Sequence, residues 1–394
     1  MSGAQRIATL DVIRGVAVMG ILLANLPAFG LPDSAYFSPL PWGVAATADR
    51  VAWALNYVLV EGKLRGLFSF LFGASLLLVV DRAEAAGESA AAVHYSRMFW
   101  LFVIGCLHLY LFWWGDILSH YALVGAIAFL FRRMPIPQLA AAGAAATLTG
   151  WLFGLGGAFI AFGGGPGAAA LFAGFGGPDP LMAAEVEAMR GGFADGVRWR
   201  WEHAGNPFSS LLVVGPETLG AMLWGMAGLR SGLLTGAWER DRYRRWAVRT
   251  LAIGWAGYAA LAALTISRDF DPRWVFLDSI VLAAPFRPLL IVGYACLIVL
   301  LMRPGGRLTD RIAAAGRAAF TNYLGTSLLM TFVFSGWGLG LFGRVGRAEL
   351  YLLAPLAWVL MLAWSTPWLD RHRHGPLEWL WRSLSRLRPR PARR

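Results

Sequence analysis

The sequence has 394 residues, of which 57% are hydrophobic and only 15% are charged. A soluble globular domain has about 25% charged residues, so this composition excludes a soluble protein and predicts an all-α, polytopic membrane protein. The net charge of +12 does not indicate nucleic-acid binding, because the arginines cluster in short segments between apolar runs, as residues that set membrane topology do.

Ten apolar segments are predicted to span the membrane as one transmembrane helical domain over residues 1–394. Most basic residues fall between these segments on the side of the N-terminus, which predicts that both termini are cytoplasmic. The predicted spans cover approximately residues 10–30, 51–80, 97–113, 116–132, 136–162, 208–229, 246–266, 276–302, 316–335 and 350–369.

The longest segment between spans, 163–207, is expected to be an external loop. Its glycine-rich beginning, 163–167, predicts a flexible linker, because it lacks the strand–glycine–helix context of a phosphate-binding loop. Its second part, 183–203, is predicted to be helical and to cover the external mouth as a lid. The basic cytoplasmic tail, 371–394, is expected to contact anionic lipid.

The first span carries polar residues along one face. At 100° per residue, Asp11, Arg14 and Asn25 lie within about 60° of one another. Because polar groups inside lipid must face protein or water, this stripe predicts hydrogen-bonding groups that point into the bundle. The alternative is that Asp11 and Arg14 are interfacial and that Asn25 forms a helix–helix hydrogen bond.

Lys63 is the single lysine among 35 basic residues, within the segment Glu61-Gly62-Lys63-Leu64-Arg65. An ammonium and a guanidinium differ in geometry, in hydration and in the ease of losing a proton. We therefore include Glu61, Lys63 and Arg65 among the candidate substrate-binding residues, with chance retention of one lysine as the alternative.

The third and fourth spans contain the clearest catalytic candidates. Arg97 and His108 are eleven residues apart and so share one helical face. Asp116 follows after a short turn, and a carboxylate that orients an imidazole produces a general base. Asp116 is also four residues before His120, which makes a contact between them available. The alternative is a histidine that only ties two helices together.

Three later spans also contain polar residues. Glu217 follows a proline in the sixth span, and Arg287 lies between Pro285 and Pro288 in the eighth. Broken helices with charges near the midplane commonly mark substrate sites, although Glu217 and Arg287 are equally well interpreted as a structural ion pair. The ninth span adds the candidates Arg317, Asn322 and Tyr323.

The two cysteines, Cys106 and Cys296, lie in apolar runs and lack a second cysteine or a histidine at metal-binding spacing. We therefore expect buried thiols and no metal site.

At these polar residues the chain resembles the YeiB-like bacterial membrane proteins, a family of unknown function. The motifs that carry the resemblance are Arg6-Ile7 with Leu10-Asp11-x-x-Arg14-Gly15 and Asn25, the segment 61–73, Gly105-x-x-His108 with Gly115-Asp116-Ile117-Leu118, Gly316-Arg317 with Thr321-Asn322-Tyr323-Leu324, and Gly375-Pro376-Leu377-Glu378-Trp379.

Wider relatives of that family are the lysosomal heparan-glucosaminide N-acetyltransferase and bacterial membrane O-acyltransferases. Their first helix has an arginine, ten intervening residues and a polar residue, which matches Arg14 and Asn25. In the O-acyltransferases that polar residue is the essential histidine, and in the heparan enzyme a catalytic histidine follows shortly after an asparagine. Here no histidine lies between Asn25 and His94. Arg97 and His108 repeat the spacing, so His108 is expected to replace that base.

The resemblance implies a membrane-embedded acyltransferase that uses acyl-CoA, such as acetyl-CoA, and an external or lipid-facing hydroxyl or amine acceptor. The expected catalytic residues are His108, Asp116 and Asn25, with Asn25 as the donor to the oxyanion. The expected acyl-donor and substrate-binding residues are Asp11, Arg14, Glu61, Lys63, Arg65, Arg97, Glu217, Arg287, Arg317, Asn322 and Tyr323.

The expected partners are membrane lipids and a small-molecule or glycan acceptor, and a homodimer is left open. The expected location is the bacterial cytoplasmic (inner) membrane. Two alternatives remain: a transporter for a small polar or anionic solute, since broken helices and buried charges also serve permeation, and a scaffold or sensor without chemistry.

Overall fold

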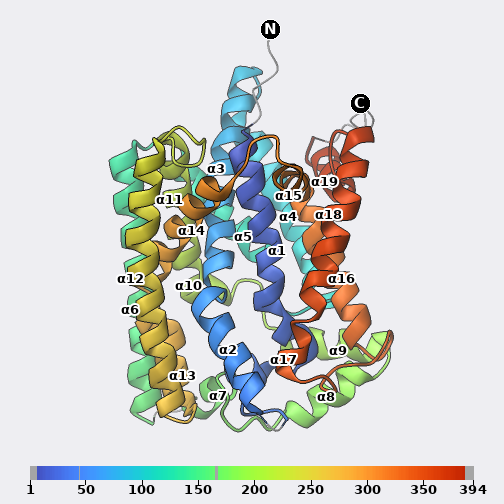
Figure 1. Ribbon diagram of the computed structural model, residues 1–394. Coiled ribbons are helices and arrows are strands. Elements are labelled where there is room, and N and C mark those ends of the chain that lie inside the picture. The colour runs from blue at the N-terminus through green and yellow to red at the C-terminus, as the bar shows by residue number, and fades with distance from the viewer. Residues whose placement is uncertain (1–6, 44, 165–166, 387–394) are drawn as a thin grey trace.

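The computed structural model describes residues 7–43, 45–164 and 167–386, and this part of the chain is helical with no β-strand (Figure 1). Arg6 and the end of the basic tail, 387–394, lie outside the described residues. The helices of the first half are α1 (Ala8–Gly30), η1 (Asp33–Ala35), α2 (Thr47–Leu59), α3 (Lys63–Ala85), α4 (Ala90–Leu111), α5 (Leu118–Ala128), η2 (Phe129–Phe131), α6 (Ile136–Phe162), α7 (Ala168–Ala173), α8 (Met182–Arg190) and α9 (Phe193–His203).

The helices of the second half are α10 (Ser210–Val213), α11 (Gly215–Arg230), α12 (Arg240–Ser267), α13 (Pro272–Phe276), η3 (Leu277–Leu282), α14 (Arg287–Leu301), α15 (Arg307–Arg317), α16 (Ala319–Phe334), α17 (Arg347–Leu350), α18 (Leu353–Arg371) and α19 (Pro376–Arg386). Of these, α11, α14, α15 and α16 pack directly against α1 or α3.

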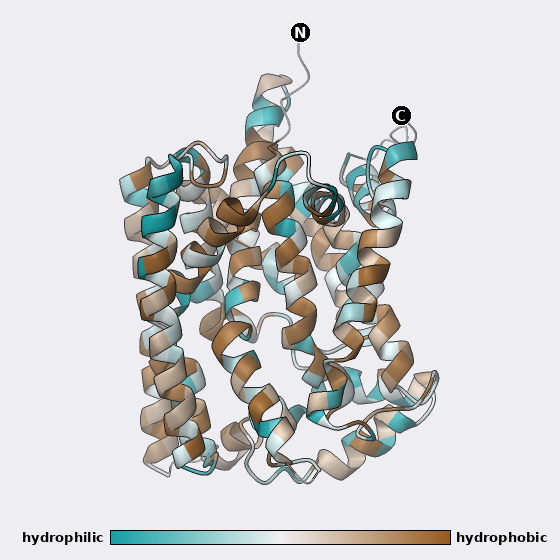
Figure 2. Ribbon diagram, viewed as in Figure 1, coloured by the Kyte–Doolittle hydropathy of each residue, from teal (hydrophilic) through white to brown (hydrophobic). Residues whose placement is uncertain are grey.

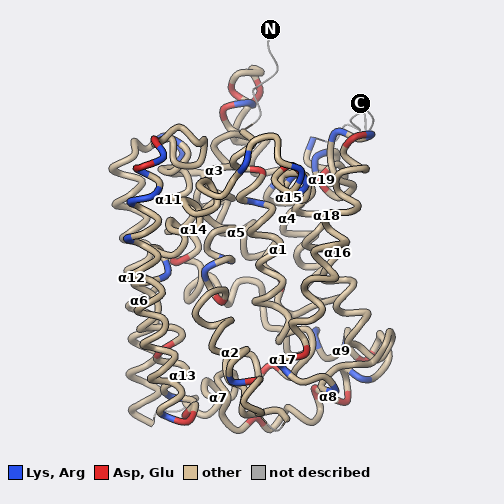
Figure 3. The backbone as a smooth tube through the Cα atoms, in the orientation of Figure 1, with Lys and Arg blue, Asp and Glu red and all other residues tan. Residues whose placement is uncertain are grey.

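Six helices of the described chain are long and apolar enough to cross a membrane, or seven if the bent pair 272–282 and 287–301 is one span. Hydrophobic residues predominate along the helices between the two ends of the bundle (Figure 2), whereas most charged residues lie near those ends (Figure 3). The structure therefore has the pattern of a helical membrane protein. Predicted spans such as 116–132 and 316–335 contain shorter helices, Leu118–Phe131 and Ala319–Phe334.

Several helices begin or break inside the bundle because of local backbone chemistry. The chain between α2 and α3 turns at Gly62, whose φ of +73° suits glycine. The pair formed by residues 272–282 and α14 is bent by 61°, and α14 has a proline in its first turn, where the missing N–H costs nothing. The expected interruption at residues 285–288 is therefore present.

The segment 163–207 contains the helices α7, α8 and α9, which lie at the end of the bundle opposite the chain termini (Figure 1). Helices α8 and α9 are joined to the rest of the chain by polar contacts. Glu185 accepts a hydrogen bond from the backbone N–H of Asp33, and Arg200 donates to the carbonyl oxygens of Tyr110 and Leu111. Residues 165 and 166 of the predicted linker lie outside the described residues.

Candidate functional site

A cavity of about 910 Å³ lies near the end of the bundle that carries both termini. Residues from α1, α3, α4, α5, α15, α16 and α19 line it, together with the turn before α19. Two lining residues, Asp11 and Glu378, are acidic, so the lining has a clear excess of positive charge. The basic lining residues are Arg14, Arg82, Arg97, Arg317, Arg373 and Arg382.

Helix α1 presents the predicted Asp11–Arg14 face to this cavity. The guanidinium of Arg14 lies 3.2 Å from the carboxylate of Asp11 and donates to Ser75 Oγ on α3 at 3.0 Å. Gly316 permits a close approach of α15 to α1, since a Cβ there would lie 1.9 Å from the carbonyl oxygen of Asp11. This approach brings Arg317 into the same cavity wall as Arg14.

Helix α19 forms another part of the cavity wall. The carboxylate of Glu378 accepts hydrogen bonds from the backbone N–H groups of Phe320 and Thr321 at the start of α16. Burial raises the pKa of Glu378, and hydrogen bonds from Thr321 oppose that shift. Trp381 donates to the carbonyl oxygen of Arg97, whose guanidinium lies 4.0 Å from the centre of the indole ring. A terminal helix thus holds one of the cavity arginines.

The cavity becomes apolar and aromatic deeper in the bundle, where Phe72, Met98 and Leu101 line it. Tyr323, 5% exposed, also lines this part. Its ring lies 5.6 Å from the imidazole of His108, measured between ring centroids. Tyr323 therefore contacts both the cavity and the predicted base, while His108 is absent from the residues that line the cavity.

His108 and Asp116 form a buried pair between α4 and the start of α5. Nδ1 of His108 lies 2.8 Å from Oδ1 of Asp116, and Oδ2 of Asp116 accepts from the N–H and the hydroxyl of Ser119 at 2.8 Å each. Gly105 allows this approach of the two helices, because a Cβ there would lie 2.2 Å from the backbone nitrogen of Ser119.

The hydrogen-bond pattern assigns roles to the two imidazole nitrogens of His108. An ionised carboxylate only accepts, so Nδ1 carries the proton and a neutral ring presents a lone pair at Nε2. Nε2 is buried and has no hydrogen-bond partner among the described residues. Because a buried polar atom without a partner is uncommon and costly, Nε2 is suited to accept a proton from a bound molecule.

The structure does not bring the Asn25 amide into a hydrogen bond with His108, since Nδ1 of His108 bonds to Asp116 and Nε2 has no partner among the described residues. Ala28 and Phe29, one turn after Asn25 on α1, contact Trp113, which lies beside His108. Trp113, whose ring centroid is 6.1 Å from that of His108, stacks on Phe29 and donates to the carbonyl oxygen of Ala28.

The contact between Asp116 and His120 that their i, i+4 spacing makes available is not formed. Nδ1 of His120 lies 3.0 Å from Ser210 Oγ, and Nε2 lies 3.0 Å from Thr218 Oγ1. The Asp116 carboxylate contacts His108 and Ser119 at the start of α5, so it points away from His120.

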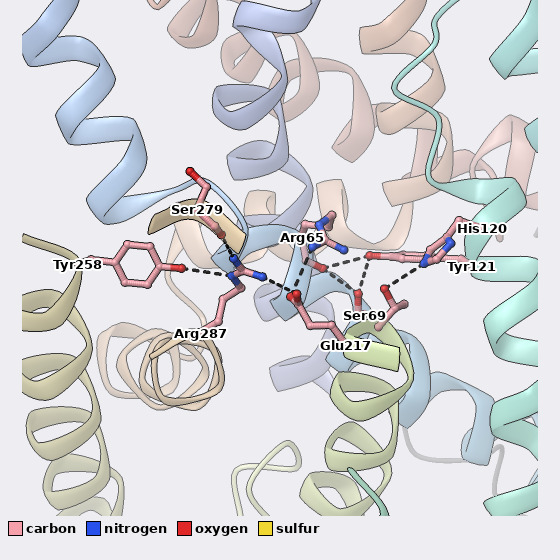
Figure 4. A network of polar contacts seen from close by, with 9 residues as sticks. Arg65, Ser69, His120, Tyr121, Glu217, Tyr258, Ser279 and Arg287 are labelled. Carbon is pink, nitrogen blue, oxygen red and sulfur yellow. Dashed lines mark hydrogen bonds and ion pairs between the residues drawn. The ribbon is translucent and has the colours of Figure 1, made fainter. Parts of the chain in front are cut away.

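A second charged cluster contains Arg65, Glu217 and Arg287 (Figure 4). One Glu217 oxygen is 3.4 Å from Arg65, and the other accepts from Arg287. Arg287 also donates to Tyr258 Oη and to the carbonyl oxygen of Ser279. These residues come from the starts of α3, α11 and α14, and they do not line the arginine-rich cavity. The interpretation of Glu217 and Arg287 as an ion pair fits these contacts.

Lys63 is fully buried next to this cluster and does not contact the cavity. Its ammonium lies 3.1 Å from the centre of the Tyr258 ring and donates to the carbonyl oxygen of Tyr57. Glu61 lies in the half-buried turn before α3. The expectation that Lys63, Arg65 or Arg287 binds the same ligand as Arg14 therefore has no geometric support.

Asn322 has a structural environment although its neighbour Tyr323 lines the cavity. Its amide donates to the carbonyl oxygen of Ala315 and to Ser365 Oγ, and its oxygen accepts from Trp364. Of the candidates, the structure gathers at the cavity or its inner wall Asp11, Arg14, Arg97, His108, Asp116, Arg317 and Tyr323.

Sequence reasoning missed several cavity residues because their local context resembles ordinary interfacial sequence. Arg82, Arg373 and Arg382 belong to the arginine clusters between apolar runs, which are typical of topology signals. A usable signal was the amphipathic character of 376–386, whose apolar side needs a partner.

Comparisons with known proteins identify relatives without a stated activity. Residues 229–388 match a family described as "Protein of unknown function (DUF418)". The chain is 34% identical to "Uncharacterized protein YeiB" of Escherichia coli (strain K12), over 98% of each chain. It is 29% identical to "Uncharacterized protein YxaH" of Bacillus subtilis (strain 168), over 98% of this chain and 96% of the relative.

Proposed function

The chain belongs to the YeiB-like family of bacterial proteins of unknown function, and we propose that it is a membrane-embedded acyltransferase that uses acyl-CoA. The acceptor would be a hydroxyl or amine outside the cell or at the lipid surface. The single observation that carries this proposal is an arginine-lined cavity whose inner wall, at Tyr323, contacts the buried His108–Asp116 pair.

The two regions of the cavity suit the two parts of an acyl-CoA molecule. Guanidinium groups form charge-assisted, often bidentate hydrogen bonds with phosphates, and six arginines line the space. Phe72, Met98 and Leu101 at the inner part offer an apolar surface for the acyl end. Such cavities of 300–1,000 Å³ are typical of small-molecule sites, and this one has about 910 Å³.

In the proposed reaction, Nε2 of His108 accepts the proton of the acceptor hydroxyl or amine. The acceptor oxygen or nitrogen attacks the thioester carbonyl carbon, the C–S bond breaks, and the coenzyme A sulfur leaves and takes the proton from the imidazolium. Asp116 stabilises the protonated ring through Nδ1. For this step Tyr323 has to move, because its ring lies between the cavity and His108. Asn25 remains the proposed donor to the oxyanion.

The proposed topology has ten spans, with both termini in the cytoplasm and the protein in the bacterial inner membrane. The cavity then opens to the side where acyl-CoA is made available. The arginines of the terminus-bearing end support this orientation, since basic residues favour the cytoplasmic side. The proposed partners are membrane lipids and a small-molecule or glycan acceptor, with dimerisation left open.

The test is turnover of acetyl-CoA by the purified protein in nanodiscs, followed as release of free thiol. The variant His108→Asn keeps a polar side chain of related shape but removes the general base. We therefore expect turnover to fall by roughly 100-fold or more while the affinity for coenzyme A is unchanged. His120→Asn is the matched control and should retain turnover. Wild-type protein that neither binds nor consumes acetyl-CoA, with membrane extract supplied as acceptor source, would contradict the proposal.

A second candidate, transport of a small polar or anionic solute, is supported by the ion cluster at the starts of α3, α11 and α14. Half-helices that begin near the midplane with charged side chains are a common feature of transporter sites. Uptake of such a solute into proteoliposomes without an acyl donor, abolished by Glu217→Gln but retained in His108→Asn, would favour this candidate over acyl transfer.

A further inference from the structure

A groove of about 500 Å³ lies on the side of α1 that carries Val12 and Val16. The other walls are residues of α3, α12, α14 and α15, with Leu59 from the end of α2. On α14 the groove extends from Tyr294 to Leu301, about 10 Å along the helix axis, or one third of the hydrocarbon thickness of a bilayer.

The groove has polar side chains in its lining, and each of them is bonded within the protein. Trp255 donates to the hydroxyl of Tyr294, and that hydroxyl donates to the carbonyl oxygen of Leu59. Thr309 accepts from the backbone N–H of Arg303. The space that remains is bounded almost entirely by hydrocarbon, so it suits an alkyl chain and not a polar solute.

Exposed basic residues adjoin the residues that line this groove. Arg307 and Arg311 are exposed on α15, the helix that contributes Leu308 and Ile312 to the lining, and Arg303 is exposed beside Thr309. Arg240 lies 3.3 Å from the carbonyl oxygen of Leu300, next to the lining residue Leu301. One acidic residue, Asp310, is interspersed among these cations on the described part of α15.

We propose that this groove binds one acyl chain of an anionic phospholipid whose phosphate is held by Arg303, Arg307 and Arg311. An alkyl chain fits the apolar wall, and a headgroup phosphate can accept hydrogen bonds from the exposed arginines that adjoin it. A neutral phospholipid satisfies the first requirement only. The site is separate from the arginine-rich cavity, and its existence does not depend on acyl transfer.

The experiment measures phospholipid that stays bound to the detergent-purified full chain. The protein is equilibrated with an equimolar mixture of phosphatidylglycerol and phosphatidylcholine, separated from free lipid, and analysed by quantitative mass spectrometry. We expect retention of phosphatidylglycerol over phosphatidylcholine. Arg307→Gln with Arg311→Gln should weaken that retention by roughly 30-fold, the factor that two arginines supply at about 1 kcal/mol each.

Two further variants separate the groove from general contact with lipid. Ile298→Trp fills the groove and should also lower retention, whereas Leu360→Trp, on the exposed surface of α18, should not. Arg133→Gln is the charge control, since Arg133 is exposed away from the groove. Equal retention of both lipids, or equal retention by the arginine double variant and Arg133→Gln, would overturn the proposal; the arginine variants decide it if Ile298→Trp does not fold.

Discussion

At the scale of single residues, Asp116 has two separable tasks. One carboxylate oxygen faces His108, and the other accepts from the backbone N–H and the hydroxyl of Ser119 at the start of α5. The second contact satisfies the free N–H of Ser119 in the first turn of α5, as the side chain of an N-cap residue does in other helices. A substitution at this position therefore affects catalysis and stability to different extents.

We expect Asp116→Asn to keep most of the hydrogen bonding to Ser119, because the amide oxygen still accepts. The variant should reduce turnover by roughly 100-fold or more, because it loses the charge that supports a general base. Asp116→Ala should lose turnover and also about 1 kcal/mol of stability. Thiol-release kinetics and thermal unfolding measure the two effects. An Asn variant with wild-type turnover would show that His108 does not act with Asp116.

The environment of Lys63 suits a lysine side chain and not the larger side chain of an arginine. The Lys63 ammonium is enclosed between Tyr258 and the carbonyl oxygen of Tyr57, with no exposed surface. The charged cluster around Lys63 has one more basic residue than acidic ones. Its basic residues are Lys63, Arg65 and Arg287, and its acidic residues are Glu61 and Glu217.

We expect Lys63→Arg to destabilise the protein by about 1–3 kcal/mol, because a larger side chain overpacks a closed site. Lys63→Met should be tolerated better, since removal of a buried charge for an apolar group of similar volume is often neutral. Thermal unfolding in detergent ranks the two variants. A Met variant that is less stable than the Arg variant would contradict this account and would favour an essential ammonium.

At the scale of elements, the Glu378 carboxylate joins α19 to the start of α16 in the cavity wall. Glu378→Ala removes the acceptor for Phe320 N–H and Thr321 N–H, so we expect a loss of about 1 kcal/mol and faster proteolysis around residues 371–376. Glu378→Gln keeps an acceptor and is the matched control. Equal proteolysis rates in wild type and Glu378→Ala would mean that other contacts hold α19.

Helix α8 is held against the segment that follows α1 by a contact that depends on pH. Burial, together with the nearby charge of Asp33, raises the pKa of Glu185 to about 8, and burial with Asp179 raises the pKa of Asp33 to about 6. A carboxyl group whose pKa is raised in the docked arrangement stabilises that arrangement when it is protonated. The contribution of Glu185 to docking is complete below its ordinary pKa of 4.5 and is lost as the pH rises through the raised pKa of about 8.

We therefore expect hydrogen exchange of residues 31–36, corrected for the intrinsic rate, to increase between pH 6 and pH 9. The variant Glu185→Gln keeps an acceptor for the Asp33 N–H but cannot ionise, so its protection should change much less than that of the wild type between pH 7 and pH 9, above the raised pKa of Asp33. A wild-type response that the Gln variant reproduces would assign the effect to another group, such as Asp33.

At the scale of the whole molecule, local chemistry was the predictable part. Hydropathy predicted the helical membrane class, and the prolines around Arg287 predicted a broken helix, because both depend on short stretches of chain. The pairing of His108 with Asp116 followed from a short turn. The separation of Lys63, Arg65 and Arg287 from Arg14 depends on which helices become neighbours, and no pattern within one helix contains that information.

We propose that the arginine-lined cavity holds coenzyme A with its thiol end towards Tyr323 and His108. The most direct measurement is a cryo-electron microscopy map of the protein in nanodiscs with saturating coenzyme A, at a resolution that shows side chains. We expect density between α1, α4, α15 and α19, with phosphates beside the cavity arginines and the thiol end beside Tyr323. A cavity without ligand density, or a thiol end that points to the opening, would contradict the account.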